Sequence, residues 1–221
     1  MKETAQSGTA RAFWLRNKAL RRMGTENRFG MMLEVLEIPE VRRRVEPVTI
    51  ERYHRMIELG FFTDKPVELI NGVIVEKISK SALHLYLVDL LFELLQTHCA
   101  GEGLWVRKED PITIGDSEPE PDLSVVRGSR IQFRHAKPTT AQFVIEVAIH
   151  SLALDRAKAR DFAKAGVPEV WIVQPEEGIT EVFRNPSAGT YSEVFEVPSD
   201  HILPSTALPG FRFQLSGALA D

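Results

Sequence analysis

A single carboxylate stands inside the most apolar stretch of the sequence. Glu146 lies within residues 143–149, a nearly continuous apolar run that is typical of a central strand covered on both faces. Burying an unpaired ionised carboxylate is very costly. Glu146 must therefore either pair with a cation or lie at an accessible strand end, which makes it the first candidate for chemistry.

Two further carboxylates stand at comparable positions. Asp122 begins the β-rich segment 122–126 after a proline-bounded acidic turn, and Glu68 has the opposite phase to its apolar neighbours in residues 67–70. Carboxylates at neighbouring strand ends form a hard-oxygen site suited to Mg²⁺ or Mn²⁺. Such ions polarise phosphoryl oxygens and generate hydroxide near neutral pH. We expect Asp122 and Glu146 to share an ion and Glu68 to supply a third ligand.

A lysine follows on the next predicted helix, at about residues 155–165. From there Lys158 could reach back over the end of the Glu146 strand, position or deprotonate an attacking water, and offset charge on a pentavalent phosphorus. Simpler interpretations stay open. Glu68 could be an exposed strand carboxylate paired with Lys77 or another cross-strand base, and Asp122 a turn residue. Glu146 and Lys158 could form a purely structural ion pair, or Lys158 could lie on a solvated helix face.

Other polar residues are less specific. We expect His84, on the polar face of its helix, to be a surface histidine rather than a contact to substrate phosphate. A basic cluster is either a phosphate-binding patch or a solvated loop, and it comprises Arg127, Arg130, Arg134, His135 and Lys137.

Local patterns predict the elements that carry these residues. Thr49, the amphipathic residues 50–59 and Gly60 indicate a capped and terminated helix. The Asn71-Gly72 pair between residues 67–70 and 73–78 predicts a hairpin, because both turn residues need a positive φ. A second amphipathic helix is expected from Ser81 to about Cys99.

The remaining segments predict a mixed sheet. Short strands are expected at about 103–107, 111–115 and 170–173, an antiparallel meander at 180–184 and 191–197, and a last strand at 211–215. The expected fold class is α/β: a mixed β-sheet flanked by helices, with an N-terminal hairpin and a C-terminal antiparallel meander.

Charge divides the chain unevenly. Residues 1–30 hold seven basic and two acidic residues, a net of +5, which leaves 20 basic and 29 acidic residues and a net of −9 for 31–221. We expect residues 1–44 to be a basic, flexible extension, with Met31-Met32 as an alternative start, and residues 45–221 to be the domain. The sequence contains no run of 18 or more apolar residues, so no membrane span is expected. The single Cys99 excludes an internal disulfide, and a cytoplasmic location is expected.

Several of these motifs resemble a known family. Pro121-Asp122 followed by Glu146-Val147 resembles the core of the PD-(D/E)XK nuclease superfamily, and residues 45–215 as a whole resemble the Uma-two (Uma2) family of proposed endonucleases. The matching stretches are residues 67–72, Ser81 with His84, and residues 119–123, 144–147 and 165–173. The resemblance implies a restriction-endonuclease-like fold and magnesium-dependent phosphodiester hydrolysis. It also implies that Glu68, Asp122 and Glu146 are metal ligands and that Lys158 is the catalytic lysine, displaced onto the helix.

The chain departs from the family pattern near the site. Ala148 stands where the superfamily places its lysine, Ile149 and His150 replace small polar or acidic residues, and the spacing from Asp155 to Lys158 is one residue short. The main prediction is a cytoplasmic, Mg²⁺- or Mn²⁺-dependent endonuclease that hydrolyses DNA, with a homodimer as one expected assembly. The alternatives are a catalytically impaired binding or assembly module with the nuclease fold, and a nuclease acting on RNA or structured nucleic acid.

Overall fold

The computed structural model describes residues 36–220. Pro47–Asp221 forms one compact unit, and the short helix α3 (Pro39–Arg42) belongs to the other unit, Met1–Glu46. Residues 1–35, which hold most of the predicted flexible extension, lie outside the described residues, and the predicted boundary after residue 44 stays a prediction. Within residues 36–220, none of the helices combines the length and the apolar character needed to cross a membrane.

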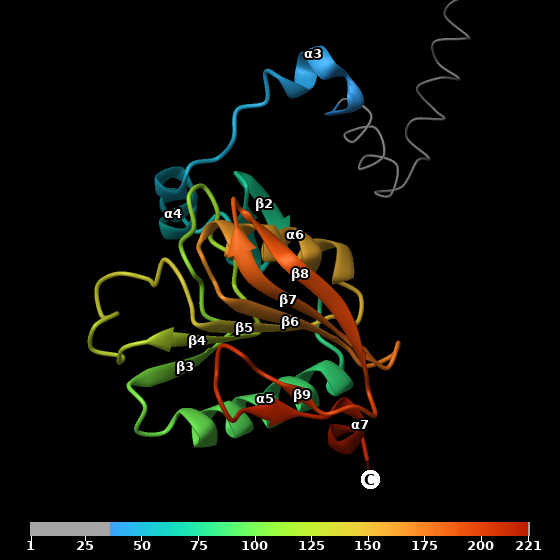
Figure 1. Cartoon of the computed structure of the whole chain (residues 1–221). Helices are drawn as coiled ribbons and strands as arrows, with labels where there is room; N and C mark the ends of the chain where they lie inside the picture. Colours follow the sequence, from blue (N-terminus) through green and yellow to red (C-terminus); the bar gives the residue numbers. More distant parts are fainter. Residues whose placement is uncertain (1–35, 221) are drawn as a thin grey trace, which may run out of the picture. The chain divides into compact units, whose positions relative to one another are not determined.

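Six strands of the larger unit form one mixed sheet in the order β3-β4-β5-β6-β7-β8 (Figure 1). Their bounds are β3 (Leu104–Lys108), β4 (Leu123–Arg127), β5 (Phe143–Val147), β6 (Glu169–Gln174), β7 (Ile179–Ser187) and β8 (Thr190–Pro198). Neighbouring strands are antiparallel except β5 and β6, which are parallel and are connected through helix α6 (Leu152–Lys164). The predicted α/β class and mixed sheet are confirmed, and the predicted meander, β6-β7-β8, is continuous with that sheet.

Helices cover both faces of the sheet (Figure 1). One face packs against α5 (Ala82–Cys99) and α7 (Leu215–Ala218), and the other against α6. Alternate residues of β5 point to opposite faces: Ile145 and Val147 join the core with α5, while Val144 packs with Phe162 of α6. Glu146 shares the phase of Val144, so its carboxylate faces α6.

The predicted first helix and hairpin are both present. Helix α4 (Ile50–Glu58) begins after Thr49, whose side chain accepts a hydrogen bond from the backbone N–H of Arg52. Strands β1 (Val67–Ile70) and β2 (Val73–Glu76) form a separate two-stranded sheet. Their turn has positive φ at both central residues, 48° at Asn71 and 74° at Gly72. The local turn chemistry is thus sufficient to define this element.

Two expected strands differ from the structure. Residues 111–115 form no strand beyond one bridge between Ile114 and Ser117, because their backbone N–H groups bond to scattered partners such as the carbonyls of Pro119 and Pro138. Ile112 and Ile114 are buried nonetheless. Strand β10 (Arg212–Phe213) pairs only with β9 (Leu203–Pro204), outside the main sheet. Apolar content correctly indicated burial in both segments, but ladder pairing depends on partners that lie far away in sequence.

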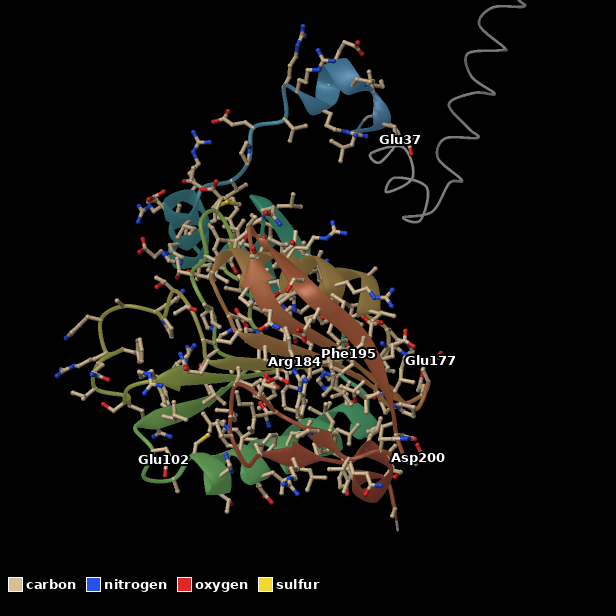
Figure 2. All side chains as sticks on the ribbon, viewed as in Figure 1. Glu37, Glu102, Glu177, Arg184, Phe195 and Asp200 are labelled. Carbon is tan, nitrogen blue, oxygen red and sulfur yellow. The ribbon has the colours of Figure 1, made fainter. Side chains whose placement is uncertain are left out.

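A buried carboxylate ties the C-terminal segment to the sheet. Glu169 is fully buried and accepts hydrogen bonds from Trp171 Nε1 (2.7 Å) and from the backbone N–H groups of Thr206 and Ala207 (2.7 and 2.9 Å). The Arg184 guanidinium donates to the same carboxylate and lies 5.3 Å from the ring centre of Phe195; the labelled pair is visible on the sheet in Figure 2. Every oxygen of Glu169 therefore has a dedicated donor.

The packing of the β1–β2 turn against Pro47 can be tested by substitution of Gly72. A Cβ added at Gly72 would lie 2.3 Å from the Pro47 Cβ, in addition to the strain of its positive φ. We expect Gly72→Ala to lower the free energy of unfolding by about 2–5 kcal/mol, from left-handed strain plus overpacking. The matched control is Gly101→Ala, which has a φ of +82° and open space around the new Cβ. It should lose only about 1–2 kcal/mol. Equal losses in urea denaturation would contradict the packing argument.

Candidate active site

Four residues singled out in the sequence line one pocket of about 90 Å³. Glu68 comes from β1, Asp122 directly precedes β4, Glu146 comes from β5 and Lys158 from α6. Their exposed fractions are only 2%, 7%, 2% and 6%. Four elements far apart in the sequence therefore deliver three carboxylates and one ammonium to the same buried place.

Lys158 lies between the carboxylates. Its Nζ is 3.1 Å from Glu68 Oε1, 3.5 Å from Glu146 Oε1 and 3.7 Å from Asp155 Oδ1. Burial opposes its positive charge, but the charges of Glu146 and Glu68 outweigh that effect and raise the pKa of Lys158 above its usual value. The lysine is therefore held as an ammonium.

Asp155 was not predicted as part of the site. Helix α6 begins at Leu152, earlier than expected, so Asp155 lies within the helix and not at its start. It is one turn before Lys158 on the same buried face. Burial raises the pKa of the Asp155 carboxyl, against the opposing charge of Lys158. The spacing of three residues between Asp155 and Lys158 is the sequence signal that could have identified it.

The alternative pairing of Glu68 with Lys77 is wrong. Lys77 instead pairs with Glu120, while Glu68 is buried and its Oε2 accepts a hydrogen bond from the Glu120 backbone N–H at 3.1 Å. The solvated helix face considered for Lys158 is likewise excluded by its burial.

Asp122 is surrounded by donors. Its Oδ1 accepts from Lys80 Nζ at 2.9 Å, and its Oδ2 accepts from the Val147 backbone N–H at 2.8 Å and lies 3.0 Å from His84 Nε2. Burial alone would raise the pKa of Asp122, but the hydrogen bond from His84 and the charge of Lys80 lower it to about 2. Asp122 is thus an anion across the physiological range.

The expectation for His84 was wrong, and Lys80 was missed. His84 is 8% exposed because the first turn of α5, which begins after Ser81, packs against the start of β4 and turns the imidazole inward. Helical phase placed this residue on the polar face, but a polar face can meet a buried carboxylate as well as solvent. Lys80 also pairs with Glu109 at 2.9 Å, a contact that no local pattern indicates.

Glu146 is the least satisfied carboxylate of the site. Its Oε2 accepts a hydrogen bond from the Asp122 backbone N–H at 3.0 Å, whereas the buried Oε1 has no hydrogen-bond partner and only the ammonium of Lys158 nearby. Burial raises the pKa of Glu146 well above its usual value, and Lys158 offsets this only in part. By contrast, burial of Glu169 is outweighed by its donors, which lower its pKa.

The pocket carries more negative than positive charge. When ionised, the carboxylates that line it outnumber the lysine ammonium groups by five to three: Glu68, Glu120, Asp122, Glu146 and Asp155 against Lys77, Lys80 and Lys158. Counted over the carboxylates and lysines alone, two negative charges remain without a counterion. Such an excess favours either protonation of a carboxyl group or binding of a cation.

The residues that depart from the family pattern lie in or next to the lining of the pocket. Ala148 is buried, its backbone N–H bonds to the Val173 carbonyl at 2.8 Å, and its methyl side chain supplies no functional group. Lys158 delivers an ammonium to the pocket from α6 instead. Ile149 and His150 also line the pocket. The basic cluster of residues 127–137 does not line it, and Lys137 pairs with Glu118.

The donor set suits a hard divalent cation. All candidate ligands are carboxylate oxygens, Glu146 Oε1 is buried without a hydrogen-bond partner, and the cluster has surplus negative charge. Among the described residues 36–220, no three His, Cys, Asp or Glu side chains stand ready-made around a single metal position. Lys158 lies among the carboxylates that would supply such a position, so a cation would compete with it for their oxygens.

Comparison with known proteins agrees with this architecture. The Uma2 family model, described as "Putative restriction endonuclease", matches residues 50–216. A crystal structure described as that of a "putative nuclease" from Anabaena variabilis ATCC 29413 superposes with a TM-score of 0.65 at 18% sequence identity. The match covers 78% of this chain and 97% of the other, and at that identity it shows a shared fold. No curated protein sequence matches the chain.

The raised pKa of Glu146 implies that replacing this residue changes the free energy of unfolding by an amount that depends on pH. Because its pKa is raised in the folded protein, the folded state binds the proton more tightly than the unfolded state does. Ionised Glu146 therefore destabilises the metal-free fold at neutral pH. We expect Glu146→Gln, in the presence of EDTA, to raise the free energy of unfolding at pH 7. The gain should shrink as pH falls from 7 toward about 4 and vanish below that, where Glu146 is protonated in both states.

The matched control is Glu169→Gln, whose carboxylate has a lowered pKa and a full set of donors. This substitution should lower the free energy of unfolding at pH 7. Urea denaturation between about pH 3.5 and 8, a range that begins below the ordinary pKa of a carboxyl group, would measure the free energy of unfolding of both variants. Destabilisation by Glu146→Gln at pH 7 would contradict our description of the site.

Proposed function

We propose that this chain, which belongs to the Uma2 family, hydrolyses phosphodiester bonds of DNA at the carboxylate pocket with a divalent metal ion. The observation that supports this most strongly is the buried group of three carboxylates around Lys158, in which Glu146 Oε1 has no hydrogen-bond partner. By contrast, both oxygens of the structural carboxylate Glu169 accept hydrogen bonds. Unsatisfied buried charge of this kind is typical of functional sites.

Asp122, Glu146 and Glu68 are the residues that would hold Mg²⁺ or Mn²⁺. When bound, the ion would polarise a phosphoryl oxygen and lower the pKa of a bound water. Lys80 and His84 hold Asp122 ionised and oriented. Lys158 stays protonated among its carboxylates, so its role is to place positive charge where the phosphoryl group becomes more negative.

The size of the pocket favours a substrate whose reactive group projects from a larger body. Its volume of about 90 Å³ is well below the several hundred Å³ typical of pockets that enclose whole small molecules. A phosphate group can enter, whereas the nucleosides on either side must lie across the opening. Lys77 and Lys80 also line the pocket, where they are paired with Glu120 and Asp122, and a phosphate group would compete with those carboxylates for them.

A non-catalytic module remains the second candidate function, and one observation favours it. The ammonium of Lys158 lies among the oxygens that a metal ion would need, and within residues 36–220 no ready-made metal position accompanies it. Titration calorimetry separates the two functions. No heat of Mn²⁺ binding at millimolar metal would favour the module, whereas binding that Asp122→Asn abolishes would favour the nuclease.

Cleavage assays test the proposal directly. We expect the chain to nick or linearise plasmid DNA with Mg²⁺ or Mn²⁺ and to be inactive in EDTA. Asp122→Asn and Glu146→Gln should each reduce the rate at least about a hundredfold, since the metal supplies several kcal/mol of transition-state stabilisation. Lys158→Met should also reduce it. Single-stranded and structured RNA, assayed in parallel, would reveal a different preferred substrate.

Glu181→Gln provides the matched control. Glu181 is also buried, but it lies outside the pocket and is bound by Arg156 and Gln174. Its loss should leave the cleavage rate within about threefold, as expected for a residue without contact to the reacting groups. Cleavage that survives both Asp122→Asn and Glu146→Gln would refute the assignment of this pocket.

A further inference from the structure

A second buried carboxylate on α6 lies outside the pocket. Asp161 is 1% exposed, and its Oδ2 accepts hydrogen bonds from Asn71 Nδ2 at 3.0 Å and from Ser117 Oγ at 2.9 Å. Ser117 Oγ in turn accepts a hydrogen bond from the Asn71 backbone N–H at 2.7 Å. Three segments of the chain thus meet at one carboxylate that does not line the pocket.

Those three segments are the ones that carry site residues. Asp161 lies one helical turn after Lys158 on α6, and Asn71 lies three residues after Glu68 in the hairpin. Ser117 belongs to the segment that runs into Asp122, and that segment also donates the Glu120 backbone N–H to Glu68. The hydrogen bonds of Asp161 therefore join the same three segments of the chain that the contacts of the pocket join.

We propose that Asp161 is a positioning residue that holds the hairpin against α6 and so maintains the contact between Lys158 and Glu68. The inference rests on the proposed function for its kinetic consequence. Its structural part, the placement of the Lys158 ammonium, stands independently of any activity.

Few other polar contacts could perform this task. Within residues 36–220, the polar links between α6 and the hairpin are Lys158–Glu68, Asp161–Asn71 and a longer one of 3.4 Å from Lys164 Nζ to Asn71 Oδ1. The hairpin also bonds to the segment before β4, through the Glu118 N–H to the Leu69 carbonyl at 2.7 Å. That bond fixes the hairpin to its neighbour but does not involve α6.

The geometry at Asn71 makes a selective variant possible. Asn71 has a φ of +48°, which glycine adopts without strain. Asn71→Gly therefore removes the side-chain link to Asp161 while keeping the turn. Ser117→Ala removes the second link to Asp161 and its bond from the Asn71 N–H. Lys164→Gln is the control on the same carboxylate: Lys164 is half exposed and pairs with Asp161 Oδ1 at 2.8 Å within α6. Besides that pair, its replacement removes only the long 3.4 Å contact to Asn71 Oδ1 and leaves both Oδ2 links intact.

Two measurements on the full-length chain test the proposal. The first is kcat and KM for Mn²⁺-dependent DNA cleavage. We expect kcat to fall about tenfold or more in Asn71→Gly and Ser117→Ala, because small misplacements of reacting groups are costly, with KM within about twofold. The second is the NMR signal of the Lys158 ammonium and its neighbouring Cε in metal-free protein. It should shift in both variants and stay unchanged in Lys164→Gln.

Glu169→Gln supplies a destabilised control on a carboxylate network that does not touch the pocket. It should keep the wild-type kcat and the wild-type Lys158 signal at temperatures where it is folded. An equal loss of kcat in Glu169→Gln would show that general stability, and not positioning, governs the rate, and would overturn the proposal. Wild-type kcat and an unshifted Lys158 signal in both Asn71→Gly and Ser117→Ala would also overturn it.

The two hypotheses fail in different ways. If the wild-type chain cleaves no nucleic acid with any divalent metal, the proposed function fails, and the Lys158 signal alone decides the role of Asp161. A shift in Asn71→Gly and Ser117→Ala but not in Lys164→Gln would then still support positioning. The absence of a shift would exclude it.

Discussion

The ion pairs of Lys158 are the interaction on which the pocket depends. Four buried carboxylates could not remain ionised together without a cation among them, because both desolvation and mutual repulsion oppose their charge. Lys158 contacts Glu68, Glu146 and Asp155 and thereby links β1, β5 and its own helix. The sheet topology makes this possible. The parallel pair β5-β6 requires a crossover, and that crossover is α6, which lies over the face of the sheet toward which Glu146 points.

Buried carboxylates serve two distinct purposes in this fold. Glu169 and Glu181 are bound by dedicated donors, which lower their pKa values and make them structural anchors. Glu146 is equally buried but keeps an oxygen without a hydrogen-bond partner, and its pKa is raised. In a protein selected only for stability, we would expect a hydrogen-bond donor to that oxygen. Its retention in the lining of a pocket is the pattern expected where stability is sacrificed for binding or catalysis.

Much of the fold was predictable because its signals are local. Asn71-Gly72 defined the hairpin, Thr49 and Ser81 marked two helix starts, and the apolar run around Glu146 indicated a central strand. The expected strand at residues 111–115 was wrong because burial there is achieved by an irregular segment. His84 was assigned to the surface because helical phase describes polarity and does not reveal what a polar face will meet.

By itself, the sequence determined most of the secondary elements, the mixed α/β class and the candidate site residues Glu68, Asp122, Glu146 and Lys158. The tertiary structure alone decided which cations meet which anions. Lys80 and His84 reach Asp122, Asp155 joins Lys158, and Asp161 ties α6 to the hairpin. The physical reason is that helix caps, turns and periodicity depend on neighbours within a few residues. Electrostatic pairing depends on which side chains the packing of distant elements brings within a few ångströms.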